Sequence, residues 1–136
     1  MDDAALKALL DSARTVAVVG LSTDPAKTSS AIASILIDAG YDVIPVHPTA
    51  TEVLDRTAYP TLADVPVPID IVDVFRPAGE AAGIAEQAVA VGAKTLWLQL
   101  GIVSEDARAI AEAGGLTYLD DICIGATTLR LGNRAA

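Results

Sequence analysis

The sequence predicts an α/β fold, a doubly wound and mainly parallel sheet of five strands with helices on both faces. Short apolar runs alternate with helical patterns along the chain, and this alternation favours a parallel sheet covered on both sides. Hydrophobic residues make up 52% of the chain but aromatic residues only 4%, which favours helices packed on a sheet over a β-sandwich. The length of 136 residues fits one domain, which we place over 1–136.

The first expected elements are a helix, a strand and a second helix. Asp2 or Asp3 can cap an N-terminal helix in which leucines recur at helical spacing. Residues 15–19 form an apolar, valine-rich run that reads as a buried parallel strand. Apolar residues at helical spacing then predict a helix at 29–39, and Gly40 is a plausible residue to end it.

A second strand at 41–46 completes a βαβ unit and is followed by His47-Pro48. The connection that follows is expected to be irregular, because prolines between residues 59 and 66 forbid a long helix. The apolar run at 69–75 predicts the third strand.

The last elements continue the alternation. An alanine-rich helix is expected at 78–91, and the apolar run at 95–100 predicts the fourth strand. Acidic residues directly after Ser104 favour the positive end of a helix that runs to about residue 114. A short fifth strand is expected at 116–119.

Charge and composition bound the partners. The formal net charge is −9, which repels phosphate backbones and argues against nucleic acid as a partner. One cysteine excludes an intrachain disulfide, and one histidine without a dense carboxylate motif gives no metal site. The chain lacks an uninterrupted apolar run of about 18 residues, so we expect a soluble cytoplasmic protein that does not enter a membrane.

The candidate site is the junction after the first strand. In open α/β sheets, ligands bind at such junctions because backbone N–H groups and a helix N-terminus point into the crevice. Here the loop after Gly20 carries Ser22, Lys27, Ser29 and Ser30, which offer hydroxyls and a cation to a phosphate. An ordinary loop and helix cap is an equally good interpretation of this stretch.

Two nucleotide-binding motifs are missing. Of the dinucleotide fingerprint G-x-G-x-x-G only Gly20 is present, and His47-Pro48 replaces the acidic residue expected after the second strand. Both differences count against NAD. Lys27-Thr28 lacks the preceding glycines of a Walker A motif.

Several segments in a fixed order resemble a known family. They are VAVVGLS at 16–22, the loop at 27–30, GYDVIPVHP at 40–48, IDIVDVFR at 69–76, GAKTLWLQLGI at 92–102 and Cys123. In these segments the chain resembles the small stand-alone coenzyme A-binding proteins, whose Rossmann-like domain also occurs in the α subunit of succinyl-CoA synthetase. The match weakens after Cys123, where such proteins carry a polar, charged stretch and this chain has IGAT.

The resemblance implies a set of ligand contacts. Gly20, Leu21 and Ser22 would approach the pyrophosphate, because small side chains let backbone amides reach anionic oxygens. Lys27 and Ser29 would add a charge-assisted contact and a hydroxyl.

Other contacts would come from the remaining strand ends. His47 and Pro48 would lie near the adenosine, and Arg76 beside Phe75 would pair with a phosphate. Gln99 and Gly101 end the fourth strand, where a glycine permits close approach of the pantetheine arm.

Cys123 would lie toward the ligand thiol and could form a mixed disulfide with it, and we assign it no catalytic duty. We therefore expect a protein that binds coenzyme A or an acyl-CoA as a carrier, sensor or regulator, without evident catalytic machinery. Two alternatives stay open: an NAD(P)-dependent oxidoreductase that uses the same crevice, and a protein-interaction module that has lost its ligand.

Overall fold

A computed structural model describes residues 1–132 of the chain. Its main sheet has five parallel strands in the order β2-β1-β5-β6-β7. The strands are β1 (Thr15–Val19), β2 (Asp42–Val46), β5 (Ile71–Val74), β6 (Thr95–Leu98) and β7 (Thr117–Leu119). The helices are α1 (Asp3–Ser12), α2 (Thr28–Asp38), α3 (Ala78–Ala90), α4 (Glu105–Ala113) and α5 (Ile124–Leu131). The predicted doubly wound α/β fold is confirmed.

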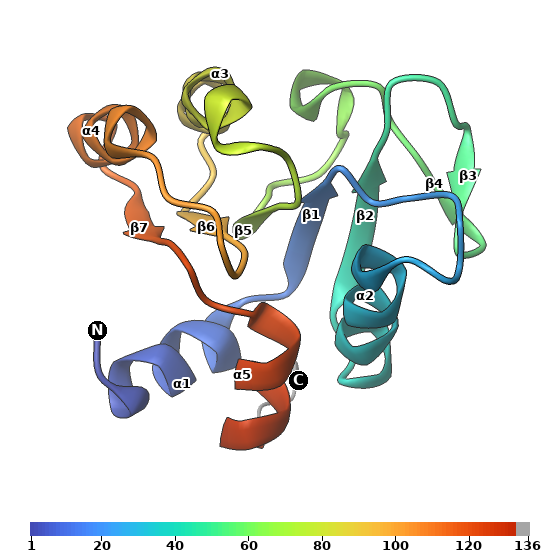
Figure 1. Cartoon of the computed structure of the whole chain (residues 1–136), viewed down its shortest axis with the longest axis horizontal. Coiled ribbons are helices and arrows are strands. Elements are labelled where there is room, and N and C mark those ends of the chain that lie inside the picture. The colour runs from blue at the N-terminus through green and yellow to red at the C-terminus, as the bar shows by residue number, and fades with distance from the viewer. Residues whose placement is uncertain (133–136) are drawn as a thin grey trace.

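Helices cover both faces of the sheet (Figure 1). Successive side chains of a strand point to opposite faces. Val16 and Val18 of β1 therefore join the core under α1, α2 and α5, whereas Ala17 joins the core under α3 and α4. Every residue of β5 and β6 is buried, as is typical of parallel strands covered on both sides.

Side-chain caps mark the starts of α1 and α4, as the sequence predicts. The Asp2 carboxylate accepts a hydrogen bond from the amide of Ala5 at 2.8 Å, and the Ser104 hydroxyl accepts one from the amide of Ala107 at 3.1 Å. Each bond satisfies an amide that the first turn of a helix leaves free.

Sequence patterns missed a hairpin, a 3₁₀ turn and a helix. A hairpin of β3 (Glu52–Val53) and β4 (Arg56–Thr57) lies in the connection expected to be irregular, beside the 3₁₀ turn at Leu62–Asp64. Helix α5 lies in the tail to which no structure was assigned. It packs across α2 so closely that a Cβ at Gly125 would lie 2.9 Å from the Ile32 side chain.

Two aspartates, one just before β5 and one within it, have opposite surroundings. The Asp70 carboxylate, just before the strand, accepts hydrogen bonds from the amides of Arg14 (2.8 Å) and Thr15 (3.0 Å) and pairs with Lys94 at 3.4 Å. Asp73 is completely buried between Val18 and Trp97, and neither of its oxygens has a hydrogen-bond partner among the described residues. Burial raises the pKa of Asp73 well above its usual range.

Within residues 1–132, no helix combines the length and the apolar character needed to cross a membrane.

Candidate functional site

The candidate site lies at the carboxyl ends of β1 and β5. After β1 the chain moves to β2 on one side, and it later returns to β5 on the other side, so the winding direction changes between β1 and β5. Ligands of open α/β sheets bind outside the strand ends at such a switch point. The junction after β1, where the sequence places the candidate site, therefore lies at this switch point.

Gly20 ends β1 in a backbone conformation with a φ of +90°, which side chains disfavour. A Cβ there would lie 2.7 Å from the carbonyl oxygen of Phe75 and 2.7 Å from Cδ of Arg76. The Gly20 amide donates to the carbonyl of Val46 at 3.3 Å. The glycine therefore lets the Arg76 side chain pass over the end of β1, while its own amide is engaged within the protein.

The loop after Gly20 is held by its own hydroxyls. The Ser29 hydroxyl accepts from the Ser22 amide at 3.0 Å, and the Ser30 hydroxyl donates to the carbonyl of Asp24 at 2.8 Å. Both serines are buried, and Leu21 is completely buried in the core. Ser29 and Ser30 thus shape the loop, and Leu21 can offer only its backbone to a ligand.

A polar hollow of about 490 Å³ lies over the ends of β1 and β2 on the α3 side of the sheet. Its walls include Gly20 and Ser22 from the loop, His47 and Pro48 from the end of β2, and Gln87 from α3. The structure therefore brings together residues that the sequence placed at the phosphate and adenosine ends of a ligand. Arg76 and its partner Glu80 also line the hollow, together with Val19, Leu21, Val46, Pro60, Thr61 and Ile84. Of the lining, Pro60, Thr61, Glu80, Ile84 and Gln87 were not predicted.

The ring of His47 is fixed by its own turn. Its Nδ1 accepts hydrogen bonds from the amides of Thr49 (3.1 Å) and Ala50 (2.9 Å), and its backbone amide donates to Tyr59 at 2.9 Å. Because Nδ1 acts as an acceptor, the proton of the neutral ring is on Nε2. His47 can therefore present a hydrogen-bond donor from the wall of the polar hollow.

Arg76 is the cation of the site. Its Nε and Nη2 donate to the two carboxylate oxygens of Glu80 at 3.1 and 2.8 Å. This hydrogen bonding raises the pKa of Arg76 and lowers the pKa of Glu80. A guanidinium has five donors, so Nη1 is left to face an anion while the Glu80 pair holds the side chain in place.

An apolar hollow of about 420 Å³ lies on the other side of Arg76, over the ends of β5 and β6. Phe75, Pro77, Leu100 and Ile102 form its apolar walls. Arg76 lines this hollow as well as the polar hollow, so the two hollows meet at this residue. Leu100, Ile102 and Pro77 were not predicted, although their place directly after strand ends was a usable signal.

Gln99 and Cys123 lie together in the apolar hollow. The Gln99 side-chain oxygen accepts from the amide of Ile124 at 2.9 Å, and Cys123 Sγ, the cap of α5, accepts from the amide of Ala126 at 3.4 Å. The cysteine is half-buried. The structure places Cys123 in the lining of this hollow, at the start of a helix that was not predicted. Its approach to a ligand thiol stays a prediction.

The loop at the rim of the apolar hollow is tied to the end of β7. The Gly101 amide donates to the Asp121 carboxylate at 2.7 Å, and the Tyr118 hydroxyl donates to Asp120 at 2.8 Å. Burial and this contact raise the pKa of Tyr118 to about 12. Gly101 has a φ of +84°, and a Cβ there would meet no atom within 4 Å. Glycine is therefore favoured by the backbone conformation of the turn and not by a neighbouring atom.

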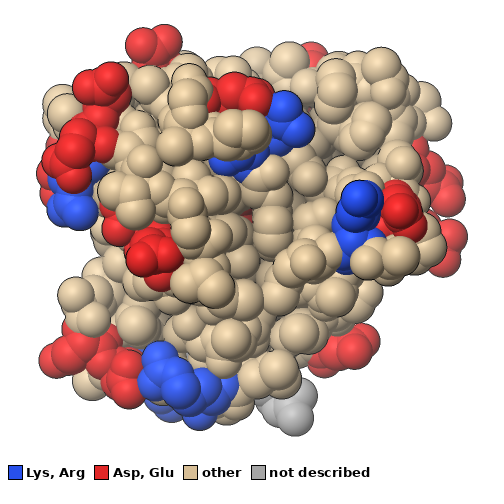
Figure 2. All heavy atoms as spheres, viewed as in Figure 1, with Lys and Arg blue, Asp and Glu red and all other residues tan. Residues whose placement is uncertain are grey.

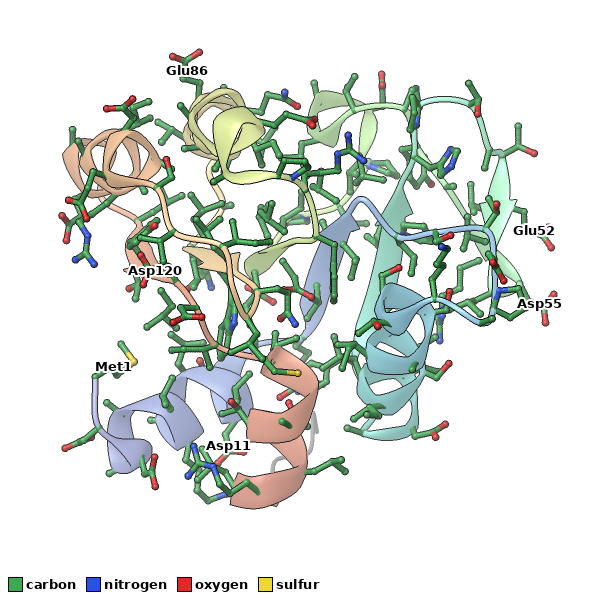
Figure 3. The ribbon with its side chains drawn as sticks, viewed as in Figure 1. Met1, Asp11, Glu52, Asp55, Glu86 and Asp120 are labelled. Atoms are coloured by element: carbon green, nitrogen blue, oxygen red, sulfur yellow. The ribbon has the colours of Figure 1, made fainter. Side chains whose placement is uncertain are left out.

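Lys27 lies apart from both hollows. It is exposed at the start of α2, whereas the adjacent Thr28 lines the apolar hollow. Figure 2 shows that basic side chains on this face lie in small groups beside acidic ones, with no continuous basic area. Glu52, Asp55 and Glu86 point outward from the hairpin and α3 (Figure 3). Within residues 1–132 no cluster of His, Cys, Asp or Glu can hold a metal ion.

Comparison with known sequences gives one family. A family model described as the CoA binding domain matches residues 14–128. A protein of Bacillus subtilis (strain 168), YneT, which is described as uncharacterized, is 40% identical over 121 residues that cover 89% of this chain and 90% of that protein.

Solved structures agree with this result. A hypothetical protein from Pyrococcus horikoshii OT3 superposes with a TM-score of 0.93 at 32% identity, over 96% of this chain and 92% of that one. A dinucleotide-forming acetyl-coenzyme A synthetase from Ca. Korarchaeum cryptofilum, in complex with phosphate and ADP, has a TM-score of 0.73 at 27% identity. The match covers 84% of this chain but only 26% of the synthetase, so this fold is one part of that enzyme.

Proposed function

Because this chain belongs to the family of CoA binding domains, we propose that it binds coenzyme A or an acyl-CoA across the polar and apolar hollows. It would act as a carrier, sensor or regulator, and its location in the cytoplasm stays a prediction. The observation that carries the proposal is the position of Arg76, which lines both hollows.

The two hollows match the two chemical halves of coenzyme A. One half is a phosphorylated nucleotide and suits the polar hollow, where the Ser22 hydroxyl and the His47 ring would offer hydrogen-bond donors. The other half is a flexible arm that ends in a thiol and suits the apolar hollow. Arg76 at the junction would meet the phosphates between the halves, since guanidinium groups bind phosphate through paired donors.

Of the two alternatives, the NAD(P)-dependent oxidoreductase has no support from the family match. A carboxylate that could hold a ribose is also missing directly after β2, where His47 and Pro48 stand. The protein-interaction module differs from our proposal in having no ligand, so a binding measurement separates them.

Thermal unfolding with different nucleotides tests the proposal. A ligand that binds only the folded state at about 100 times its Kd stabilises that state by about 2.7 kcal/mol. We expect coenzyme A to raise the Tm in this way, and NAD and NADP at equal concentration to raise it much less. An equal or larger shift with NAD would refute the assignment, and no shift with any of them would favour the interaction module.

The Arg76–Glu80 pair gives a prediction about binding. Arg76→Ala should weaken coenzyme A binding, because hydrogen bonds to charged groups contribute roughly 1.5–3 kcal/mol. Glu80→Gln keeps the side-chain shape but removes the competing charge, so we expect it to tighten binding. Lys27→Ala should weaken binding less than Arg76→Ala, because Lys27 lines neither hollow.

Titration calorimetry with coenzyme A and dephospho-CoA measures these changes. A residue that contacts only the 3′-phosphate loses its effect with dephospho-CoA, whereas one that contacts the pyrophosphate keeps it. We expect Arg76→Ala to weaken the binding of both ligands by the same factor, because Arg76 lies between the hollows. Wild-type affinity in this variant would show that Arg76 does not hold the phosphates.

A further inference from the structure

Exposed apolar side chains lie at and beside the rim of the apolar hollow. Leu100 is 69% exposed and Val103, in the same loop, is 50% exposed. They are two of the five large hydrophobic side chains exposed within residues 1–132, and Leu100 forms the rim of a hollow whose walls are Phe75, Pro77 and Ile102. Burying such a surface against an apolar group is favourable.

The same hollow contains a buried amide with an unused donor. Gln99 is only 4% exposed, and its oxygen is committed to the amide of Ile124. Gln99 lines the hollow, and no hydrogen bond joins its Nε2 to another residue within 1–132. The enclosed side-chain atoms without a partner in this part of the chain belong to Asp73 and Thr128, so Nε2 is open to an acceptor on a ligand in the hollow. A carbonyl oxygen is such an acceptor, whereas a thiol is a weak one.

We propose that the preferred ligand is an acyl-CoA with an apolar acyl group, whose chain lies on Leu100 and Ile102 and whose thioester carbonyl accepts from Gln99. This inference rests on the proposed function, because it needs the nucleotide half in the polar hollow. It adds the substrate class: a thioester rather than free coenzyme A.

Calorimetric titration with coenzyme A, acetyl-CoA, butyryl-CoA and hexanoyl-CoA tests this proposal. A fully buried methylene raises the affinity roughly four-fold. In this open hollow we expect about half of that free energy, which is roughly two-fold in affinity for each methylene. Hexanoyl-CoA should therefore bind on the order of ten-fold more tightly than acetyl-CoA. If coenzyme A binds but affinity does not rise with chain length, the acyl proposal is wrong and the proposed function stands. If none of the four binds, the proposed function itself fails.

Variants locate the effect. Leu100→Asn should reduce the ratio of the coenzyme A Kd to the hexanoyl-CoA Kd at least three-fold. Because Leu100 is exposed, we expect this variant to fold as the wild type does. Leu129→Asn is the matched control, because Leu129 is 67% exposed on α5 and lines neither hollow. Gln99→Glu keeps the acceptor for Ile124 and removes the donor, so it should lower the affinity for the thioesters. An unchanged ratio in Leu100→Asn, or an equal loss in the control, would overturn the placement of the acyl chain.

Discussion

Replacing Gly20 with alanine is expected to lower the free energy of unfolding by about 2–5 kcal/mol. Two costs add at this position. A side chain disfavours the positive φ of +90°, and its Cβ would lie 2.7 Å from the carbonyl oxygen of Phe75, which is backbone and cannot turn away. The Arg76 stem would also have to move, so the variant should lose coenzyme A binding beyond its loss of stability.

Gly83→Ala is the matched control for this experiment. Gly83 lies inside α3, and a Cβ there would meet no atom within 4 Å. Alanine is the better helix former by about 1 kcal/mol, so the control should be slightly stabilised. Chemical denaturation of both variants measures the difference. A Gly20→Ala protein as stable as the wild type would contradict the strained junction between β1 and Arg76.

Asp73→Asn is expected to stabilise the protein at neutral pH. Burial raises the pKa of Asp73 well above its usual range, so the folded protein keeps a proton that the unfolded chain releases near pH 4. Folding then binds a proton, and wild-type stability falls as the pH rises from about 4 to the folded-state pKa. The slope is about 1.4 kcal/mol per pH unit. Asparagine removes this slope, so its advantage grows by about 2.7 kcal/mol over two pH units in this window.

Asp70, just before the same strand, should give the opposite dependence of stability on pH, and Asp70→Asn should remove it. Burial acts to raise the pKa of Asp70, but the amide hydrogen bonds from Thr15 and Arg14 and the Lys94 ammonium outweigh it and lower the pKa. Wild-type stability from this group is therefore present above the unfolded-state pKa and lost as the pH falls through the folded-state pKa. Urea unfolding at several pH values compares the two variants. Equal slopes for wild type and Asp73→Asn would show that Asp73 is not a buried, protonated acid.

The sequence predicts the main sheet and four of its helices because their signals are local. Strands β1, β2, β5 and β6 are apolar runs followed within three residues by glycine or proline, and caps such as Asp2 and Ser104 mark the helix starts. Helix α5 has poor local signals, since Gly125, Thr127 and Thr128 are weak helix formers. It is stabilised by packing on α2, where Gly125 meets Ile32, and a contact between distant segments is invisible in the pattern. The spacing of Ile124 and Leu131 before Gly132 was the one usable signal.

The position of the candidate site can be predicted from the sequence, but the hydrogen-bond partners of its side chains cannot. Strand order places the ends of β1, β2, β5 and β6 at one edge, which is why Gly20, His47, Arg76 and Gln99 fall around the hollows. The bonds within the loop, from Ser29 and Ser30, depend on how it folds back on itself. The Glu80 partner of Arg76 and the orphaned carboxyl of Asp73 likewise depend on which side chains reach one another.

The central claim is that coenzyme A lies across the two hollows at the switch point. Mapping of backbone amide chemical shifts during a coenzyme A titration tests it most directly, because each amide reports its own surroundings. We predict shifts at Gly20, Ser22, His47, Arg76 and Gln99, and none at Asp42, Thr95 and Thr117, which begin strands at the opposite edge of the sheet. Shifts confined to the opposite edge, or none at saturating coenzyme A, would contradict the claim.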